Sequence, residues 1–420
     1  MIEHSQINSE SVDDWLNYLD SLNPEKIELG LDRIRRVFLA MKLDVRSRII
    51  TVAGTNGKGT TVAVLDALLS QKEFSCGAYT SPHLFHFSER IRICGARVSD
   101  KALVDGFQHV ERCRGDTVLT YFEFSTLVAA YIFSQSDLDF WLLEVGLGGR
   151  LDAVNIFEPD AAIVTNIGTD HASWLGDTRE KIGVEKAGIY RSHKPAIYSA
   201  ADRPVTIDAA IGEREASPVL YRKHFEVSEN RFIWQGRPEA AIPRLKNISE
   251  EIVAGAIAGL RSLGMSVIDK ELEVLEDLKI PGRFQTLTSN RFGRTSTFIA
   301  DVAHNAESVG LLANRLTNNG YIDLTAVFGC MTDKNLEDLL KPLIPLVTRW
   351  ILCRPNVPRA LEPEIIQSKL IALGVEKSQI TQCPKLKMLS EYISSDDNIL
   401  VYGSFYTVGE CLSELGVKID

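Results

Sequence analysis

The segment from Arg48 to Thr61 constrains the fold of this chain more than any other, because it joins an apolar stretch to a helical pattern through glycines. Gly54 and Gly57 permit a tight turn, and their missing side chains let backbone N–H groups face a phosphate. Lys58 adds a positive charge, and the helix that follows adds the positive end of its dipole. The segment therefore predicts a polyphosphate-binding loop.

The spacing of this loop differs from the common pattern G-x-x-x-x-G-K-[ST]. Only two residues separate Gly54 from Gly57, and Gly59 stands where a metal-binding hydroxyl is usual. A strand-to-helix turn without a ligand is the alternative interpretation, which the cluster of Gly, Lys and Thr disfavours. If Gly59 supplies no hydroxyl, the magnesium ion that accompanies ATP needs an oxygen ligand from another part of the chain.

Two further apolar stretches read as core strands that end in polar residues. Phe140–Glu144 ends on a carboxylate, and Ala161–Thr165 leads within a few residues to His171. In a parallel sheet, ligands bind beyond the carboxyl ends of the strands. We therefore expect Thr51–Lys58, Glu144 and His171 to meet at one edge of a mostly parallel sheet.

Glu144 alone would be read as a surface carboxylate, but beside a phosphate loop it is a good magnesium ligand. His171 alone would be read as a structural histidine, and a metal contact is an equally weighted alternative. Ser81 is the candidate for the missing hydroxyl. It lies in the mixed apolar and polar segment Thr80–Arg92, which is expected to be a long loop that covers something.

Lys186 follows Glu185 on a helical pattern from Thr178 to Gly188. On base rates, the favoured interpretation is a solvated lysine in an ion pair. From the residues alone, no chemical role is assigned to it.

From Thr295 onwards, apolar stretches typical of strands again alternate with helical patterns, which indicates a second α/β domain. The segment Ile280–Gln285, which precedes this region, is interpreted as a hinge between the domains. We therefore predict an α/β protein in which a P-loop ATPase domain with a mostly parallel sheet is joined to a smaller, Rossmann-like α/β domain. The expected domains are residues 1–282 and 283–420.

Composition narrows the class of protein. A chain of 420 residues is long for one core, and its formal charge of −10 argues against nucleic-acid binding. The N-terminus lacks a signal-peptide pattern, and no apolar run is long enough to span a membrane. Seven scattered cysteines without C-x-x-C pairs suggest reduced thiols. A cytoplasmic protein without nucleic-acid or membrane partners is expected.

Several motifs, taken together and in order, resemble the folylpolyglutamate synthase family within the Mur ligase superfamily. The resemblance covers nearly the whole chain. The segments that carry it are Gly54–Thr60, Thr80–Leu84, Thr120–Glu123, Glu144–Ala153, Asp170–Gly176, Glu185–Ile189, Asp301–Asn305 and Gly403–Val408.

The resemblance implies an ATP-dependent, magnesium-dependent ligase of folate biosynthesis. Such an enzyme adds L-glutamate to 7,8-dihydropteroate, giving dihydrofolate, and to the γ-carboxylate of tetrahydrofolate. Both reactions would pass through an acyl phosphate. A monomer that binds only small-molecule substrates is expected.

The resemblance also implies roles for individual positions. ATP would contact Gly57, Lys58, Gly59, Thr60, Arg283 and Asp301, and magnesium would bind Ser81, Glu144 and His171. Lys186 would be N6-carboxylated, which reverses the interpretation given above, and Lys58, Lys186, His171 and Glu144 would carry the chemistry. The pterin would contact Thr120, Tyr121, Phe122, Glu123, Leu151, Asp152 and Ala153, and the incoming glutamate His304 and Ser404.

Two alternatives stay open. A Mur-type ligase acting on a UDP-sugar would share the ATP chemistry, although the aromatic Thr80–Phe87 segment and Phe122 favour a flat pterin. A catalytically silent ATP-binding regulatory protein is suggested by Ile252, which stands where the family often has an asparagine that touches ATP.

Overall fold

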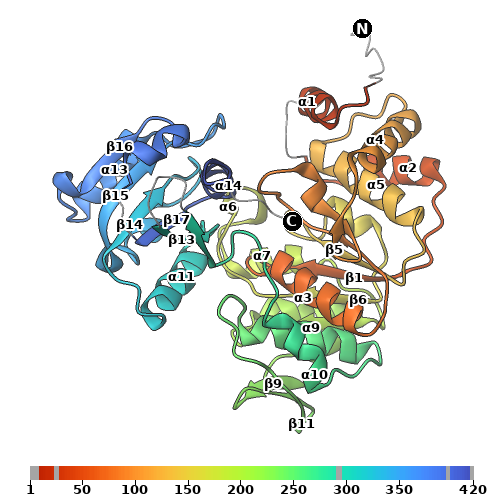
Figure 1. The fold of residues 1–420 in the computed structure, drawn as a ribbon. Coiled ribbons are helices and arrows are strands. Elements are labelled where there is room, and N and C mark those ends of the chain that lie inside the picture. Colours follow the sequence, from red (N-terminus) through yellow and green to blue (C-terminus); the bar gives the residue numbers. More distant parts are fainter. Residues whose placement is uncertain (1–8, 23–27, 290–295, 394–397, 417–420) are drawn as a thin grey trace. The chain divides into compact units, whose positions relative to one another are not determined.

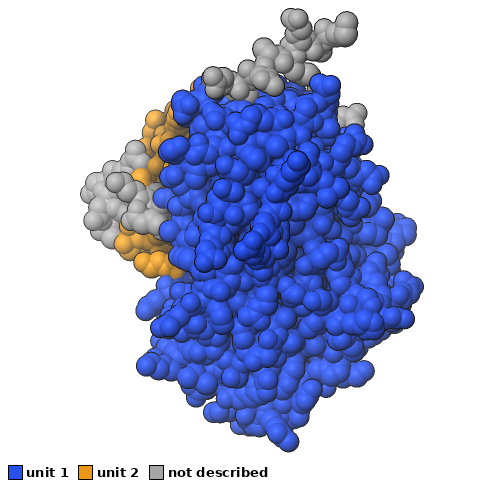
Figure 2. Space-filling model, turned by 90° about the vertical axis from the view of Figure 1, so that its right-hand side faces the viewer, with its two compact units in different colours: residues 1–83, 87–278 blue, residues 84–86, 279–420 orange. Residues whose placement is uncertain are grey.

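The computed structural model describes residues 9–22, 28–289, 296–393 and 398–416. It divides into two compact units, which Figure 2 colours separately: unit 1 comprises residues 1–83 and 87–278, and unit 2 comprises residues 84–86 and 279–420. The sequence places the domain boundary after residue 282, and the units divide a few residues earlier. The short segment Leu84–His86 belongs to unit 2, which no sequence pattern indicates.

Unit 1 is built on an eight-stranded sheet, counted over the described residues, in the order β4-β3-β2-β5-β1-β6-β7-β8. In this sheet order, β2, β5, β1, β6, β7 and β8 are parallel to one another. At one edge, β3 pairs antiparallel with β2, and β4 pairs antiparallel with β3. Their bounds are β1 Arg48–Ala53, β2 Cys76–Tyr79, β3 Ile91–Ile93, β4 Ala96–Arg97, β5 Phe140–Glu144, β6 Ala161–Val164, β7 Pro195–Tyr198 and β8 Ser217–Leu220.

Helices cover both faces of this sheet. Figure 1 shows α2, α4 and α5 grouped on one side of β5 and β1, and α3, α9 and α10 on the other. The helices of unit 1 are α1 Val12–Leu22, α2 Asp32–Met41, α3 Lys58–Gln71, α4 Asp100–Arg114, α5 Tyr121–Ser134, α6 Ala172–Leu175, α7 Arg179–Ala187, α8 Val205–Glu213, α9 Glu250–Ser262 and α10 Asp269–Leu272. The central strands β1, β5 and β6 are mostly apolar, as expected for strands of a parallel sheet with both faces buried.

A small antiparallel sheet in the order β11-β10-β9 completes unit 1. Its strands are β9 Phe225–Ser228, β10 Arg231–Trp234 and β11 Arg237–Ala241. Unit 1 also contains the short 3-10 helices η1 Phe87–Arg90, η2 Ala153–Ile156 and η3 Glu273–Leu275.

Unit 2 has a six-stranded sheet, counted over its described residues, in the order β12-β13-β17-β14-β15-β16, and β12 is antiparallel to its neighbour. Alternate residues of β13 and β14 enter two separate apolar clusters, so both faces are buried. The strands are β12 Gln285–Ser289, β13 Ser296–Asp301, β14 Leu324–Phe328, β15 Val347–Cys353, β16 Ile380–Cys383 and β17 Asn398–Tyr402. The helices are α11 Ala306–Asn318, α12 Leu336–Leu340, α13 Pro363–Ala372 and α14 Phe405–Glu414, with 3-10 turns η4 Ile344–Leu346, η5 Lys377–Gln379 and η6 Leu386–Glu391.

These arrangements confirm the predicted α/β class and its mostly parallel sheets. The prediction of a continuous loop over Thr80–Arg92 was wrong at its end, where η1 leads into β3. There Ile91 pairs with Tyr79, because backbone groups next to a sheet edge are best satisfied by a further strand. Among the described residues, no helix combines the length and apolar character that crossing a membrane requires.

Candidate active site

The phosphate loop lies between β1 and the N-terminus of α3, as its sequence predicts. Gly57 is the N-cap with φ of 83°, a left-handed conformation that glycine adopts without strain. The following residues, Lys58 to Thr60, form the first helical turn, whose N–H groups have no acceptor within the helix. The turn therefore offers donors to an anion.

The residues after β6 hold this loop in place. Thr165 donates from Oγ1 to the carbonyl of Asn56 at 2.6 Å, and Asn166 accepts from the N–H of Asn56 through Oδ1 at 2.9 Å. Gly54 has φ of 150°, and a Cβ on it would lie 1.8 Å from Thr165 Oγ1. Gly54 is thus required for the contact between the loop and β6.

Two lysines donate to the carbonyl of Gly54. Lys58 Nζ lies 3.1 Å from this oxygen, and Lys186 Nζ, on α7, lies 2.8 Å from it. Burial, and then the charge of Lys58, lower the pKa of Lys186 to about 7. The interpretation of Lys186 as a solvated lysine was wrong, since only 4% of it is exposed and Glu185 pairs with Arg150 instead.

Glu144 and Ser81 contact each other beside the loop. The N–H of Ser81 donates to Glu144 Oε2 at 3.0 Å. The same carboxylate oxygen lies 3.2 Å from the position that a Cβ on Gly59 would take. Glycine at this position therefore leaves room for the carboxylate, and a hydroxyl residue enters from β2 rather than from α3.

The strand register brings these groups to one edge of the sheet. Val52 of β1 pairs with Glu144 of β5, and Ala53 pairs with Val164 of β6, so all three strands end at the same level. His171 follows β6 with φ of 53°, and its N–H donates to Asp170 Oδ1. The phosphate loop, Glu144 and the end of β6 therefore lie at one edge of the sheet, as expected, and the meeting of His171 with Glu144 stays a prediction.

Ser81, Glu144 and His171 offer a hydroxyl, a carboxylate and an imidazole, which is a donor set that suits a divalent ion. No three His, Cys, Asp or Glu side chains form a complete metal cluster in the part of the chain that is described. A magnesium ion at this edge would therefore complete its shell with phosphate and water oxygens, as Mg²⁺ commonly does.

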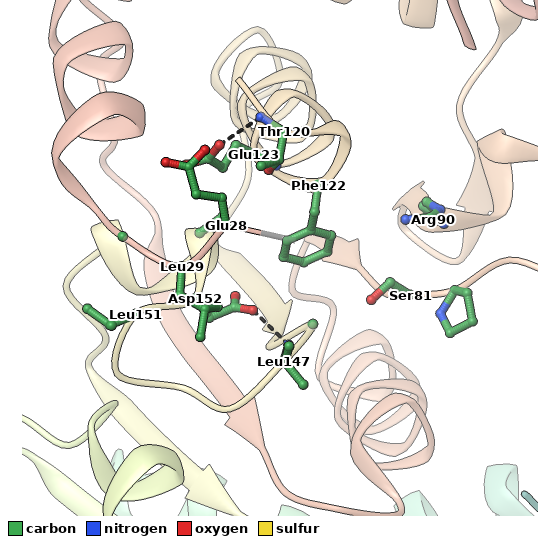
Figure 3. A pocket seen from close by; sticks show the side chains of 14 residues that line it. Glu28, Leu29, Ser81, Arg90, Thr120, Phe122, Glu123, Leu147, Leu151 and Asp152 are labelled. Carbon is green, nitrogen blue, oxygen red and sulfur yellow. Dashed lines mark hydrogen bonds between the residues drawn. The ribbon is translucent and has the colours of Figure 1, made fainter. Parts of the chain in front are cut away.

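A pocket of about 210 Å³ opens beside Ser81 (Figure 3). Apolar side chains form much of its wall, with Phe122 stacked on Tyr79 at a centroid distance of 5.8 Å. A Cβ on Gly146 would lie 2.5 Å from the Phe122 ring, so this glycine admits the ring. The lining residues are Glu28, Leu29, Gly30, Ser81, Pro82, Arg90, Thr120, Phe122, Glu123, Gly146, Leu147, Leu151, Asp152 and Ala153.

Carboxylates enter the pocket wall. Asp152 accepts from the N–H of Leu147 at 2.8 Å and from that of Val154 at 3.0 Å, and burial raises its pKa to about 7. Glu123 accepts from the N–H of Thr120 at 2.8 Å in a capping box that begins α5. Buried acceptors of this kind suit a heterocycle with amino and N–H groups.

Most of the residues predicted for pterin binding line this pocket, but Tyr121 does not. Its ring lies under the guanidinium of Arg90, at 5.4 Å. Two parts of the lining, Glu28–Gly30 and Arg90, were not predicted from the sequence. The first group lies between two helices with no strand end or motif to mark it, and the second lies in a segment read as an undifferentiated loop.

In unit 2, the predicted residues gather at the carboxyl ends of β13 and β17. Asp301 accepts from the N–H groups of Phe284 and Ala303, both at 2.9 Å, and burial raises its pKa. The Arg283 guanidinium lies over the Phe405 ring at 5.4 Å.

The two positions expected near glutamate lie at the same strand ends. His304 Nδ1 is 2.8 Å from the carbonyl of Val302, and its ring is 6.0 Å from that of Phe405. Ser404 caps α14 by accepting from the N–H of Thr407 at 3.0 Å. The Ser404 hydroxyl therefore has a structural partner already.

Comparison with known proteins gives matches over the whole chain. Residues 52–221 match the Mur ligase middle domain, and residues 282–405 match the Mur ligase, glutamate ligase domain. A dihydrofolate synthase/folylpolyglutamate synthase of Escherichia coli (strain K12) is 36% identical over 96% of this chain and 95% of its own length. One of Haemophilus influenzae is 34% identical over 94% and 96%.

Solved structures agree with these relatives. Escherichia coli FolC in complex with DHPP and ADP has a TM-score of 0.89 and 32% identity, covering 98% of this chain and 99% of that one. A bifunctional folylpolyglutamate synthase/dihydrofolate synthase of Yersinia pestis, complexed with AMPPNP and Mn ion, has a TM-score of 0.88 and 34% identity, covering 98% and 100%.

We predict that Gly54→Ala lowers turnover by roughly 10²-fold, because displacing the loop by about 1 Å misplaces the phosphates. Gly95→Ala is the matched control: Gly95 also has a positive φ, of 78°, but nothing lies within 4 Å of its Cβ position. Steady-state rates of ADP release should fall for the first variant alone. Equal rates would show that the contact with Thr165 does not set the loop.

Proposed function

This chain belongs to the dihydrofolate synthase/folylpolyglutamate synthase family of Mur ligases, and we propose that its described site residues perform that family's ATP-dependent addition of L-glutamate. The chain is accordingly an ATP-dependent ligase of folate metabolism. The two substrates that would accept glutamate are 7,8-dihydropteroate and tetrahydrofolate.

One observation carries the proposal. Ser81 lines the pocket that contains Phe122, and its N–H donates to Glu144, which lies against the first turn of the phosphate-loop helix. A pteridine substrate in the pocket would therefore direct its carboxylate towards the phosphates. Phe122 would stack on the heterocycle, while Glu123 and Asp152 would accept from its amino and N–H groups. Thr120, Leu151 and Ala153 complete the proposed contacts, with Tyr121 supporting Arg90.

In the first step, an oxygen of the substrate carboxylate attacks the γ-phosphorus of ATP. The bond to the β,γ-bridging oxygen breaks, which gives an acyl phosphate and ADP. Lys58 and the backbone N–H groups of Gly57, Gly59 and Thr60 hold the phosphates and offset the charge that moves to the leaving oxygen.

In the second step, the amine of glutamate attacks the acyl carbon. The tetrahedral intermediate releases inorganic phosphate, the nitrogen loses a proton, and an amide is formed. We propose that His304 and Ser404 help to place the incoming glutamate and that Arg283 and Asp301 contact ATP. The convergence of all four on the ends of β13 and β17 supports a common site in unit 2.

Ser81, Glu144 and His171 are the residues that would hold a divalent ion. When bound, magnesium would neutralise part of the negative charge of the phosphates. Glu144 would also fix the Ser81 backbone through the hydrogen bond already present.

For Lys186 we propose N6-carboxylation. An amine attacks CO₂ only when unprotonated, and with a pKa of about 7 much of this lysine is neutral at physiological pH. The reaction forms an N–C bond, releases one proton and leaves a carbamate anion. That anion would place a negative charge beside Lys58 where a protonated Lys186 would place a positive one, so attraction would replace repulsion between the two side chains.

The alternatives receive less support. None of the relatives described is named as a UDP-sugar ligase. The pocket offers the Phe122 ring for stacking and buried carboxylates that accept hydrogen bonds, which suit a pterin. A silent regulatory protein would not need a complete set of phosphate-loop, carboxylate and lysine groups. The cytoplasmic location and monomeric state expected from the sequence stay predictions.

The proposed function predicts ADP release when the protein is incubated with ATP, Mg²⁺, L-glutamate and either 7,8-dihydropteroate or tetrahydrofolate. The products should be heavier than the acceptor by one or more glutamyl groups, as read by mass spectrometry. Omitting glutamate is the control. ATP binding without consumption would favour the silent protein, and turnover with a UDP-sugar acceptor alone would favour the Mur-type ligase.

Lys58→Ala should lower kcat by roughly 10²- to 10³-fold, because it removes a charge directed at the transferred phosphoryl group. The measurement is single-turnover ADP formation at saturating ATP. Lys72→Ala is a control on the same helix segment, since Lys72 lies just beyond the end of α3 and pairs with Glu271. Near-normal turnover by the Lys58 variant would refute its role.

Lys186→Ala should abolish activity, and small carboxylates such as formate or acetate should restore part of it by supplying the missing anion. In the native protein, ¹³C NMR with ¹³CO₂ should show a carbamate signal. The signal should grow as pH rises through about 7, because the neutral amine becomes more abundant. Full activity of the variant without rescue, or no carbamate at pH 8, would contradict the proposal.

A further inference from the structure

Arg33 joins two segments that form one wall of the pocket. From α2, its Nε donates to Glu123 Oε2 at 2.8 Å. Its two terminal nitrogens bind Glu28, one at the backbone carbonyl and one at the carboxylate. The single guanidinium thus connects Glu28, which precedes α2, to Glu123 in the first turn of α5, and we call this set the arginine clasp.

The clasp places a positive charge between two carboxylates that both line the pocket. Figure 3 shows the Glu28 and Glu123 side chains next to each other at one end of the pocket. Without the guanidinium, two like charges would face each other in a confined space and repel. Arg33 itself is not among the lining residues, so it acts on the pocket only through these two partners.

One oxygen of Glu123 is left for a ligand. Oε2 is occupied by Arg33 Nε and by the N–H of Thr120. Oε1 is buried and has no hydrogen-bond partner among the described residues. A buried carboxylate oxygen without a donor is costly, and a ligand N–H that reaches it would remove that cost.

We propose that Arg33 is a positioning residue for the pteridine substrate, which holds the Glu123 carboxylate through Oε2 and aims its Oε1 at an amino or N–H group of the heterocycle. The inference rests on the proposed function and assigns Arg33 to recognition of the acceptor rather than to ATP chemistry. The core contacts of α2 come from other residues, since Ile34, Val37 and Met41 are the buried residues of that helix.

The test uses Arg33→Met, which removes the charge, and Arg33→Lys, which keeps the charge but loses the fork of donors. Arg36→Met is the matched control, since Arg36 lies on the same helix and is exposed. Apparent KM values are measured separately for 7,8-dihydropteroate and for ATP, with kcat at saturation of both.

We expect Arg33→Met to raise the KM for dihydropteroate roughly 10- to 100-fold, the effect of losing a charge-assisted hydrogen bond. The KM for ATP and the saturated kcat should change less than about threefold, Arg33→Lys should restore part of the loss, and Arg36→Met should match the native protein. Parallel changes in both KM values, or an unchanged KM for dihydropteroate, would overturn the inference.

If Arg33→Met does not fold, the comparison of the two KM values in Arg33→Lys decides the question. Failure of the proposed function is distinguishable, because the native protein would then release no ADP with dihydropteroate and glutamate at all.

Discussion

The site depends on a single backbone oxygen, the carbonyl of Gly54, which accepts from both Lys58 and Lys186. Two ammonium groups at one acceptor are electrostatically unfavourable, and the burial of Lys186 prevents water from screening them. Burial, and then the charge of Lys58, lower the pKa of Lys186 to about 7, and conversion of Lys186 into a carbamate anion would remove the repulsion between the two ammonium groups. The same carbonyl position requires glycine, because Thr165 lies where a side chain would begin. The loop's geometry, its charge balance and its connection to β6 therefore follow from one residue.

The missing side chain of Gly59 likewise leaves room for a functional group, the Glu144 carboxylate. A serine or threonine there, as in the common loop, would place its Cβ against Glu144. The carboxylate instead occupies this space and binds the N–H of Ser81, so a hydroxyl residue arrives from the end of β2. Because Ser81 is also part of the pocket wall, the residue that replaces the usual hydroxyl links the phosphate loop to the place where an acceptor would bind.

The sequence predicted the features that depend on local chemistry: the loop, the core strands and the sheet edge that carries the loop, Glu144 and the end of β6. Parallel register makes this edge predictable, since strand ends align without knowledge of side-chain packing. The burial of Lys186 was not predictable from the residues. Glu185 precedes it in the sequence, so an exposed ion pair between the two was a plausible interpretation. Glu28 and Arg33 were missed since their significance arises only when the segment before α2 packs beside α5. Edge strands such as β3 were missed for a different reason. A segment of two or three residues is too short to show the alternation of apolar and polar side chains that identifies a strand.

Ile252 is a position in unit 1 at which the residue departs from what the resemblance implies. Its Cδ1 lies 2.9 Å from the position that a Cβ on Gly57 would take, so α9 packs an aliphatic group against the phosphate loop. A methyl group cannot make the hydrogen bond of an asparagine, but it can support the left-handed turn at Gly57 by contact. At Ile252, α9 therefore supports the phosphate loop through an apolar contact, whereas the resemblance implies a polar contact with ATP from this position. Because Glu144, the Ser81 backbone and both lysines lie around the loop, we propose that Ile252 weakens or reorients nucleotide binding and leaves the chemistry of the site in place.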